Sequence, residues 1–174
     1  MCSSDLLYQQ KLIYKDTRLV NWDTKLETAI SDLEVEQREV QSNLYYIKYN
    51  IVGENNQISI ATTRPETMIG DTAVAINPRD ERYKNFVGKK ILIPIVNREV
   101  EIISDNYVSM EQGSGALKVT PAHDFNDFDI GKRHNLKFIN IFEKNGKVNN
   151  EAPGEFVGLD RFEARKLIVK KLKE

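Results

Sequence analysis

Short runs of β-branched and aromatic residues, separated by turn-forming residues, dominate the stretch between Leu44 and Phe142. Such runs are typical of strands, and Gly53–Gln57 and Asn97–Arg98 have the composition of hairpin turns. Many closely spaced strands interrupted by few helices predict an α+β fold, with a barrel-like β core decorated by helices. The predicted strands are residues 44–52, 58–63, 72–76, 90–96, 99–103, 116–120 and 138–142.

Two segments, one inside this β-rich stretch and one after it, carry apolar residues at helical spacing. They predict helices at Asp124–His134 and Leu159–Leu172. The basic last turn of the second helix suits the helix dipole. The side chains expected to face inward are Phe125, Phe128 and Ile130 in the first helix, and Phe162, Leu167 and either Ile168 or Val169 in the second.

The first forty residues lack the regular strand pattern that begins at Leu44, and they predict an appendage to the core. Residues 3–12 indicate a short helix capped by Ser3 or Ser4, and Arg18–Asp23 a short strand. Residues 24–31 are ambiguous, and Leu33–Val40 fits an edge strand or a linker. We therefore predict two parts: residues 1–40, a helix and connecting strands, and residues 41–174, the core with its C-terminal helix.

Composition narrows the function classes. The chain has 174 residues and a net charge of −1, which excludes nucleic-acid binding through bulk electrostatics and leaves only local contacts. Its one cysteine, Cys2, allows no disulfide within the chain and argues against a cysteine-based zinc site, so we expect a reducing, cytoplasmic location. No apolar run approaches the roughly 18 residues of a membrane helix, so no membrane partner is expected.

A polar loop between two predicted strands, Ala61–Thr72, carries residue types that are poor choices for packing alone. Pro65 disfavours a helical conformation at the residue before it, which turns the loop away from a helix. Strand ends that present polar side chains often bind ligands, although an ordinary turn with capping threonines fits the spacing equally well. The side chains presented are Thr62, Thr63, Arg64 and Thr67.

The segment Gly113–Ala122 places a Gly-x-Gly sequence before a strand, which lets the backbone approach a ligand closely. It lacks the third glycine of a dinucleotide site and the lysine placement of a phosphate-binding loop. Lys118 and Thr120 are two residues apart, so on a strand they point to the same face. Because both are polar, that face is either solvent or a site.

A third polar segment, His123–Asp129, begins the first predicted helix. Asp124 and Asp127 are spaced so that they share a helix face, where two carboxylates can hold an ammonium group. Acidic residues in a first turn also complement the helix dipole without further purpose. His123 is a candidate general base, but a cap or a packed side chain is the commoner role for such a histidine.

Together these segments resemble the editing insertion of valyl-tRNA synthetases. The resemblance rests on LVNWDTKLETAISDLEVE, ATTRPETMIGDTAVAINPRDERY and QGSGALKVTPAHDFNDFDIGKRHNL, in the family's order and over nearly the whole chain. Isoleucyl- and leucyl-tRNA synthetases have similar insertions, but Arg64–Thr67 followed by Gly70–Ala73 is similar to the valyl branch. One departure is Gln112, where relatives often have an aromatic residue, so binding of the tRNA end is expected to be weaker or differently arranged here.

The resemblance implies a hydrolase that removes threonine from mischarged tRNA(Val) and spares valyl-tRNA(Val). A hydrophobic synthetic site rejects threonine by only about a hundredfold, which makes a second site necessary. The His-Ile-Gly-His-type and Lys-Met-Ser-Lys-Ser-type motifs of the synthetic site do not occur in this sequence. The resemblance therefore implies a fragment that needs no cofactor or metal for editing, with ATP and Mg required only by the parent ligase.

Residue roles follow from the same resemblance. Asp127 matches the residue that holds the substrate's α-ammonium, and with Thr67 it is the expected catalytic residue. Asp124 and Lys118 match the pair that recognises the threonine hydroxyl. The remaining expected binding residues are Arg64 and Thr120 in the pocket and Thr62 and Thr63 on the side of the terminal adenosine.

The resemblance also implies the partners: the aminoacylated 3′ end of tRNA(Val) and the rest of the synthetase chain, with the domain itself a monomer. Two alternatives stay open, a tRNA-end binding module that is inactive in isolation and an isoleucyl-type editing domain. A free-standing editing protein is disfavoured, because residues 14–36 resemble the stretch that joins the insertion to the synthetase body, and the way the chain begins predicts a fragment of a longer protein.

Overall fold

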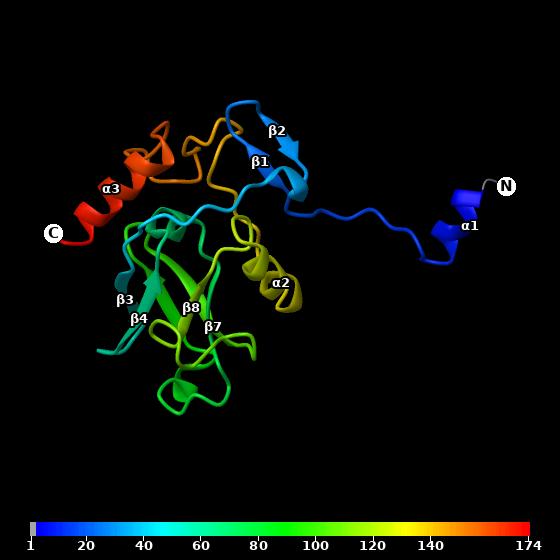
Figure 1. Ribbon diagram of the computed structural model, residues 1–174. Helices are drawn as coiled ribbons and strands as arrows, with labels where there is room; N and C mark the ends of the chain where they lie inside the picture. The colour runs from blue at the N-terminus through cyan, green and yellow to red at the C-terminus, as the bar shows by residue number, and fades with distance from the viewer. Residues whose placement is uncertain (1–2) are drawn as a thin grey trace.

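A six-stranded β-sheet forms the body of the protein, whose computed structural model describes residues 3–174 (Figure 1). Its strands are β3 (Tyr45–Ile51), β4 (Gln57–Thr62), β5 (Ala73–Ile76), β6 (Lys90–Ile93), β7 (Arg98–Ser104) and β8 (Ala116–Val119). The strand order is β4-β3-β6-β7-β5-β8, and every neighbouring pair is antiparallel except β5 and β7. The edge strands β4 and β8 also contact each other, so the sheet is a nearly closed barrel. The predicted α+β fold with a barrel-like core is confirmed.

The hairpin of β3 and β4 shows why the sequence specifies this sheet. Buried and exposed residues alternate along β3, as the pleat of a half-buried strand requires. The register pairs Asn50 with Gln57 and Tyr45 with Thr62, which leaves the predicted turn at Gly53 between the strands. Gly53 has φ 79°, a left-handed conformation that glycine adopts without steric cost.

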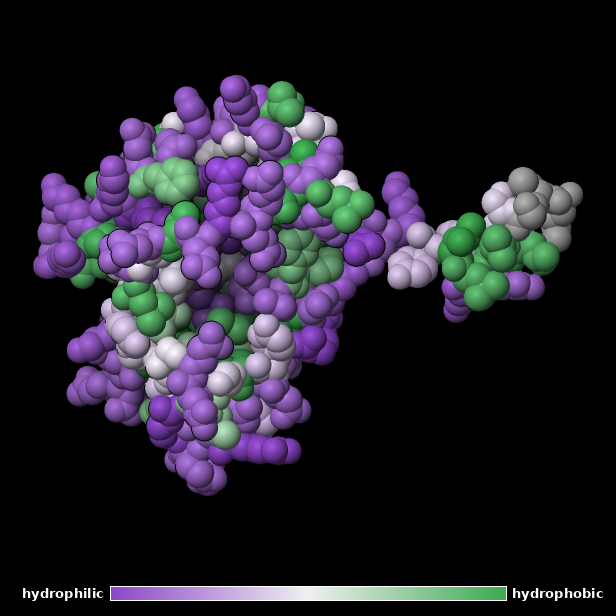
Figure 2. Space-filling view, viewed as in Figure 1, coloured by the Kyte–Doolittle hydropathy of each residue, from purple (hydrophilic) through white to green (hydrophobic). Residues whose placement is uncertain are grey.

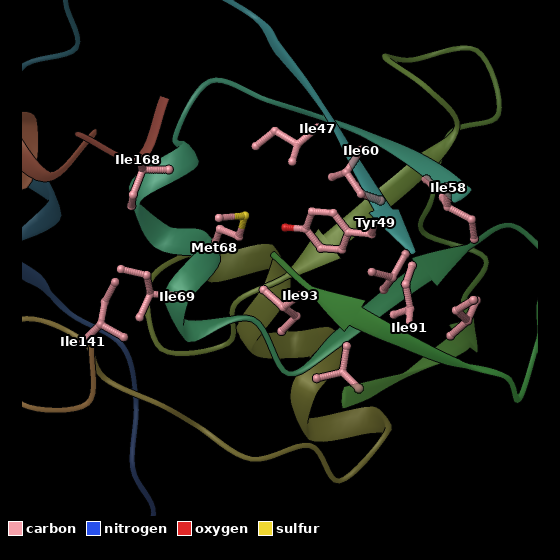
Figure 3. Packing of buried hydrophobic residues seen from close by; sticks show 14 of the residues in the cluster. Ile47, Tyr49, Ile58, Ile60, Met68, Ile69, Ile91, Ile93, Ile141 and Ile168 are labelled. Carbon is pink, nitrogen blue, oxygen red and sulfur yellow. The ribbon is translucent and has the colours of Figure 1, made fainter. Parts of the chain in front are cut away.

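The main core lies inside the barrel and consists mostly of isoleucine. Each fully buried isoleucine contributes roughly 1.5–3 kcal/mol relative to an exposed one. Tyr49 is the largest fully buried side chain, and its hydroxyl points toward Met68 (Figure 3). The same core cluster includes Ile47, Ile58, Ile60, Ile69, Ile91, Ile93, Ile141 and Ile168, and the last two lie beyond Met68 as seen from Tyr49.

Helical segments cover the ends of the barrel. The 3-10 helix η2 (Pro65–Gly70) follows β4, and a second short one, η3 (Lys84–Phe86), precedes β6. Helix α2 (Phe125–Arg133) contacts β8, and helix α3 (Arg161–Lys171) contacts η2. The polypeptide therefore brings its last helix back onto the loop that follows β4.

The first forty residues form an extended arm and a small hairpin. Helix α1 (Ser3–Gln9) lies at the end of the arm, away from the barrel (Figure 1), and apolar side chains cluster there (Figure 2). Strands β1 (Asn21–Asp23) and β2 (Thr28–Ile30) pair, and η1 (Asp32–Glu34) follows them. The Trp22 indole N–H donates to the Lys144 carbonyl at 2.7 Å, which joins this hairpin to the core. The division at residue 40 stays a prediction, and Cys2 lies outside the described residues.

Two sequence predictions about strands and packing are wrong. Residues 138–142 form no strand: only Phe142 makes an isolated bridge, with Val148, and the Ile141 N–H donates to a histidine side chain instead. Phe125 and Phe162 do not face inward, since they are 52% and 51% exposed. Each lies in the first turn of its helix, just after the capping residue Asp124 or Asp160. In this position the aromatic ring lies on the outer face of the helix.

One ion pair fastens the loop after β4 to helix α3. Arg165 donates from Nε and Nη2 to the two carboxylate oxygens of Glu66, at 2.7 and 2.6 Å. Glu66 is 1% exposed and its second cationic partner, Arg64 Nε, is more distant at 3.9 Å, so its charge depends mainly on Arg165. We expect Arg165→Met to lower the free energy of unfolding by about 2–3 kcal/mol in urea titrations. Arg161→Met is the matched control, because Arg161 stacks on the same ring, Phe162, without an ion pair among residues 3–174, and an equal loss in both variants would contradict this assignment.

Candidate functional site

A pocket of about 140 Å³ opens between the loop after β4 and the start of helix α2. All eight side chains singled out in the sequence line it: Thr62, Thr63, Arg64, Thr67, Lys118, Thr120, Asp124 and Asp127. Ala61, Leu117 and His123 complete the wall. Three segments that are distant in sequence thus meet here because β4 and β8 close the barrel beside each other.

The loop wall of the pocket is held by hydrogen bonds that the loop makes to itself. Arg64 has φ −126° and ψ 67°, outside the helical region, as the following proline predicts. Its backbone N–H donates to the Thr62 hydroxyl at 3.1 Å, and the Thr67 hydroxyl donates to its carbonyl at 3.0 Å. These contacts leave an oxygen lone pair on the Thr67 hydroxyl and the hydroxyl proton of Thr62 for a ligand.

The strand wall carries a buried polar network centred on Asp71. Lys118 and Thr120 share a face of the chain as predicted, with Nζ donating to the Thr120 hydroxyl at 2.5 Å. Both also donate to Oδ1 of Asp71, at 3.2 and 2.5 Å, and the Tyr49 hydroxyl donates to Oδ2 at 2.8 Å. Burial raises the pKa of Asp71, which the Lys118 ammonium and the two hydroxyl donors oppose. Asp71 is 0% exposed, so the carboxylate of the Lys118–Asp71 ion pair is completely buried.

Two carboxylates form the helix wall. Asp124 caps α2: its Oδ1 accepts from the backbone N–H groups of Asn126 and Asp127, at 2.9 and 3.2 Å. Asp127 is 6% exposed, and its Oδ2 accepts from the Thr120 N–H at 2.8 Å. Within residues 3–174, Oδ2 of Asp124 and Oδ1 of Asp127 accept no further hydrogen bond. Each aspartate therefore offers one unused oxygen beside the pocket.

Burial changes the proton affinity of Asp127. It raises the pKa of this carboxyl to about 6; Lys118 and the Thr120 N–H oppose the rise, and the neighbouring carboxylates of Asp124 and Asp71 add to it. Asp127 is therefore mostly ionised at neutral pH, although burial makes its charge unfavourable. A cationic group on a ligand would offset this desolvation cost. A raised pKa in a pocket is typical of a functional carboxylate.

Asp71 and Tyr49 are site residues that the sequence reasoning missed. A single aspartate after Gly70 fits an ordinary turn, so its sequence position does not distinguish Asp71. The one signal is a carboxylate two residues before the apolar strand β5, where burial demands a charged or hydroxyl partner. Neither residue lines the pocket, so both act through Lys118 and Thr120.

The glycine-rich turn does not contribute donors to the pocket. Residues 113–115 are not part of its lining, and the Gly115 N–H donates to the Gln112 carbonyl at 3.1 Å. Gly113 instead packs against Ala61, where a Cβ would lie 2.8 Å from the alanine methyl, and Gln112 is exposed.

The described residues contain neither a metal-binding cluster nor a membrane-spanning helix. In residues 3–174 no three His, Cys, Asp or Glu side chains are grouped so that they could hold a metal ion. Over the same residues no helix has both the length and the apolar character to cross a membrane. The expectation of a metal-free and cofactor-free reaction stays a prediction.

Comparisons with known proteins agree with the fold. The sequence model of the family described as "Leucyl-tRNA synthetase, editing domain" matches residues 80–157. The valine–tRNA ligase of Pelagibacter ubique (strain HTCC1062) is 62% identical over 97% of this chain and 19% of its own length. That of Syntrophotalea carbinolica is 56% identical over 91% of this chain and 18% of its own length.

A solved structure supports the fold. It is described as the ternary complex of Agrobacterium radiobacter K84 agnB2 LeuRS with tRNA and LeuAMS, and it matches with a TM-score of 0.60 and 20% identity over 74% of this chain and 18% of that one. The architecture is thus that of an aminoacyl-tRNA synthetase editing domain. The chain belongs to the valine–tRNA ligase family, as its editing domain, and spans about a fifth of the length of the relatives it matches.

Proposed function

We propose that this domain hydrolyses the ester of threonyl-tRNA(Val) and spares valyl-tRNA(Val). The observation that carries the proposal is the unused oxygen of Asp127, a buried carboxylate facing a small pocket whose lining is mostly polar. A free α-ammonium group would satisfy this carboxylate by a charge-assisted contact. Such a contact selects an aminoacyl ester over an ester without the amino group.

The reaction needs a positioned water molecule and little else, because an ester is already activated. The water oxygen adds to the carbonyl carbon, the bond to the ribose oxygen breaks, and that oxygen takes a proton originating from the water. The products are threonine and a tRNA with a free terminal hydroxyl. Asp127 and Thr67, with the neighbouring ribose hydroxyl, are the groups that we assign to positioning the water.

Selection of threonine follows from hydrogen bonds left unused in the pocket. Lys118 has three ammonium protons, of which two go to Asp71 and Thr120, so the third is available to the threonine hydroxyl. The unused Oδ2 of Asp124 can accept the proton of that same hydroxyl. Valine would leave both groups unpaired in a partly buried site, which is costly.

The test is a deacylation assay with matched substrates. The domain is mixed with tRNA(Val) carrying either threonine or valine, and the ester remaining is followed in time. Rapid loss of threonine with valine retained supports the proposal. Release of neither, at high protein concentration, leaves a tRNA-end binding module that is inactive in isolation. Asp124→Asn keeps the helix cap but removes the carboxylate, and we expect it to lower the ratio of threonine to valine release by about tenfold.

Deacylation should depend on the ionisation of Asp127. We expect kcat/KM to fall as pH is lowered through about 6, since a neutral carboxyl no longer attracts the ammonium group. The measurement is kcat/KM from pH 5 to 8, after subtraction of uncatalysed hydrolysis. A profile that stays flat between pH 7 and 5 would show that Asp127 is not the ammonium partner.

The wider context is part of the same proposal. The parent protein would be a valine–tRNA ligase that uses ATP and Mg in a separate synthetic domain, whereas editing would use no cofactor. The partners would be the aminoacylated 3′ end of tRNA(Val) and the remainder of the synthetase, with a monomeric domain in the cytoplasm. The relatives support this context, because each is about five times longer than the stretch matched here.

A further inference from the structure

The side chain of His123 is fixed by a backbone hydrogen bond whose direction determines where its proton lies. The Ile141 N–H donates to Nε2 of His123 at 3.0 Å. A ring nitrogen that accepts a hydrogen bond carries no proton, so the neutral imidazole must be protonated on Nδ1. The ring also packs edge-on against Phe142, with centroids 4.9 Å apart, which fixes its orientation.

The surroundings of His123 keep the ring uncharged. Burial, together with the positive charges of Arg64 and Lys118, lowers its pKa to about 4. The backbone carbonyl of His123 accepts from Nη1 of Arg64 at 3.0 Å, which keeps that positive charge close. At neutral pH the ring is therefore a neutral donor through Nδ1 and an acceptor through Nε2.

The donor Nδ1–H is unused by the protein. No residue in the described part of the chain accepts a hydrogen bond from it, and the buried side-chain atoms without a partner are only Thr72 Oγ1 and Arg98 Nε. Nδ1 is thus not sealed inside the core, and the side chain lines the pocket beside Asp124 and Asp127. An oriented donor beside a pocket is suited to an oxygen on a bound molecule.

We infer that His123 binds an ester oxygen of the aminoacyl group through Nδ1–H, as a neutral hydrogen-bond donor and not as a general base. The inference rests on the proposed function. Negative charge develops on the carbonyl oxygen when water adds to the ester, and a preorganised donor stabilises that charge. The amides of residues 113–115 do not line the pocket, and the Gly115 N–H is bonded to the Gln112 carbonyl. A base at this position would need a free lone pair, and the lone pair of Nε2 is committed to Ile141.

The tautomer can be measured without any substrate. The chain has two histidines, so a His134→Gln variant assigns the ¹⁵N resonances of His123 unambiguously. We expect the spectrum of a protonated Nδ1 and an unprotonated Nε2, unchanged from pH 8 to 5.5. A proton on Nε2, or titration of the ring near pH 6.5, would overturn the inference.

Two substitutions separate the donor from the structural role of the ring. The amide of His123→Asn can place an N–H near the position of Nδ1 but loses the acceptor for Ile141. The side chain of His123→Gln can place an oxygen near Nε2 but loses the donor. We expect His123→Asn to have the lower Tm and to retain deacylation within about tenfold of the unsubstituted domain. His123→Gln should keep its Tm and lose about 100-fold in kcat.

Activity that follows Tm in both variants, or full activity in His123→Gln, would overturn the donor role while leaving the proposed function intact. If the unsubstituted domain releases neither amino acid, the proposed function fails and the role in ester binding fails with it. The NMR result would still decide the tautomer in that case.

Discussion

Asp127→Asn lowers deacylation of threonyl-tRNA(Val) by at least about 100-fold and at the same time stabilises the fold. The loss of rate follows because an amide cannot replace a desolvated carboxylate as partner of an ammonium group. The gain in stability follows from the pKa of about 6: folding raises the pKa of this carboxyl above its ordinary value of 3.8, so at neutral pH the folded state bears the cost of the charge. In the unsubstituted domain, the destabilisation by the ionised Asp127 carboxylate therefore diminishes as pH falls below 6 and returns as pH rises through 6.

The asparagine is neutral at every pH and can still accept from the Thr120 N–H. We expect it to raise the free energy of unfolding at pH 7 by about 1–3 kcal/mol, and by much less at pH 4. Urea titrations at both pH values measure this difference. Asp129→Asn, on the exposed side of the same helix, is the control, and equal effects of the two variants on rate would contradict the role of Asp127.

Asp71→Ala destabilises the domain by about 3–5 kcal/mol, because it leaves the ammonium of Lys118 buried without its carboxylate. It also removes the acceptor that orients Lys118 and Thr120, so selection of threonine is lost with it. Tyr49→Phe is the matched control: it removes one hydrogen bond to Asp71, leaves both charges in place and should cost about 1 kcal/mol.

A double variant distinguishes charge from packing. Asp71→Ala combined with Lys118→Met removes both charges and should recover much of the stability that Asp71→Ala loses, since replacing a buried ion pair by apolar groups is often neutral. It should not recover selection of threonine over valine. If the double variant is no more stable than Asp71→Ala alone, the loss arises from the cavity and not from an unpaired charge.

The fold could be predicted to a large extent from local patterns in the sequence. The alternation along β3 and the turn at Gly53 specify a hairpin without reference to distant residues. The segment 138–142 has the same β-branched and aromatic composition but forms no strand, because its hydrogen bonds go to His123 and to the Asn149 side chain and backbone. Composition cannot reveal such partners, which lie far away in the sequence or on a turn.

The site, like the fold, could be predicted from local sequence only in part. The residues that line the pocket were recognisable as polar side chains at strand ends and at a helix start, and their roles stay predictions. For Asp71 the sequence carried only a weak signal, since its burial depends on the pairing of β5 with β7 and β8. The proton position on His123 depends on a contact to Ile141, which only the three-dimensional structure contains.

A crystal structure of the domain with a non-hydrolysable threonyl-adenosine analogue would locate the bound amino acid. We expect the α-ammonium group within hydrogen-bond distance of Oδ1 of Asp127, with the threonine hydroxyl between Lys118 and Asp124. The analogue bound elsewhere on the domain, or bound in this pocket with its ammonium group facing solvent, would contradict this expectation.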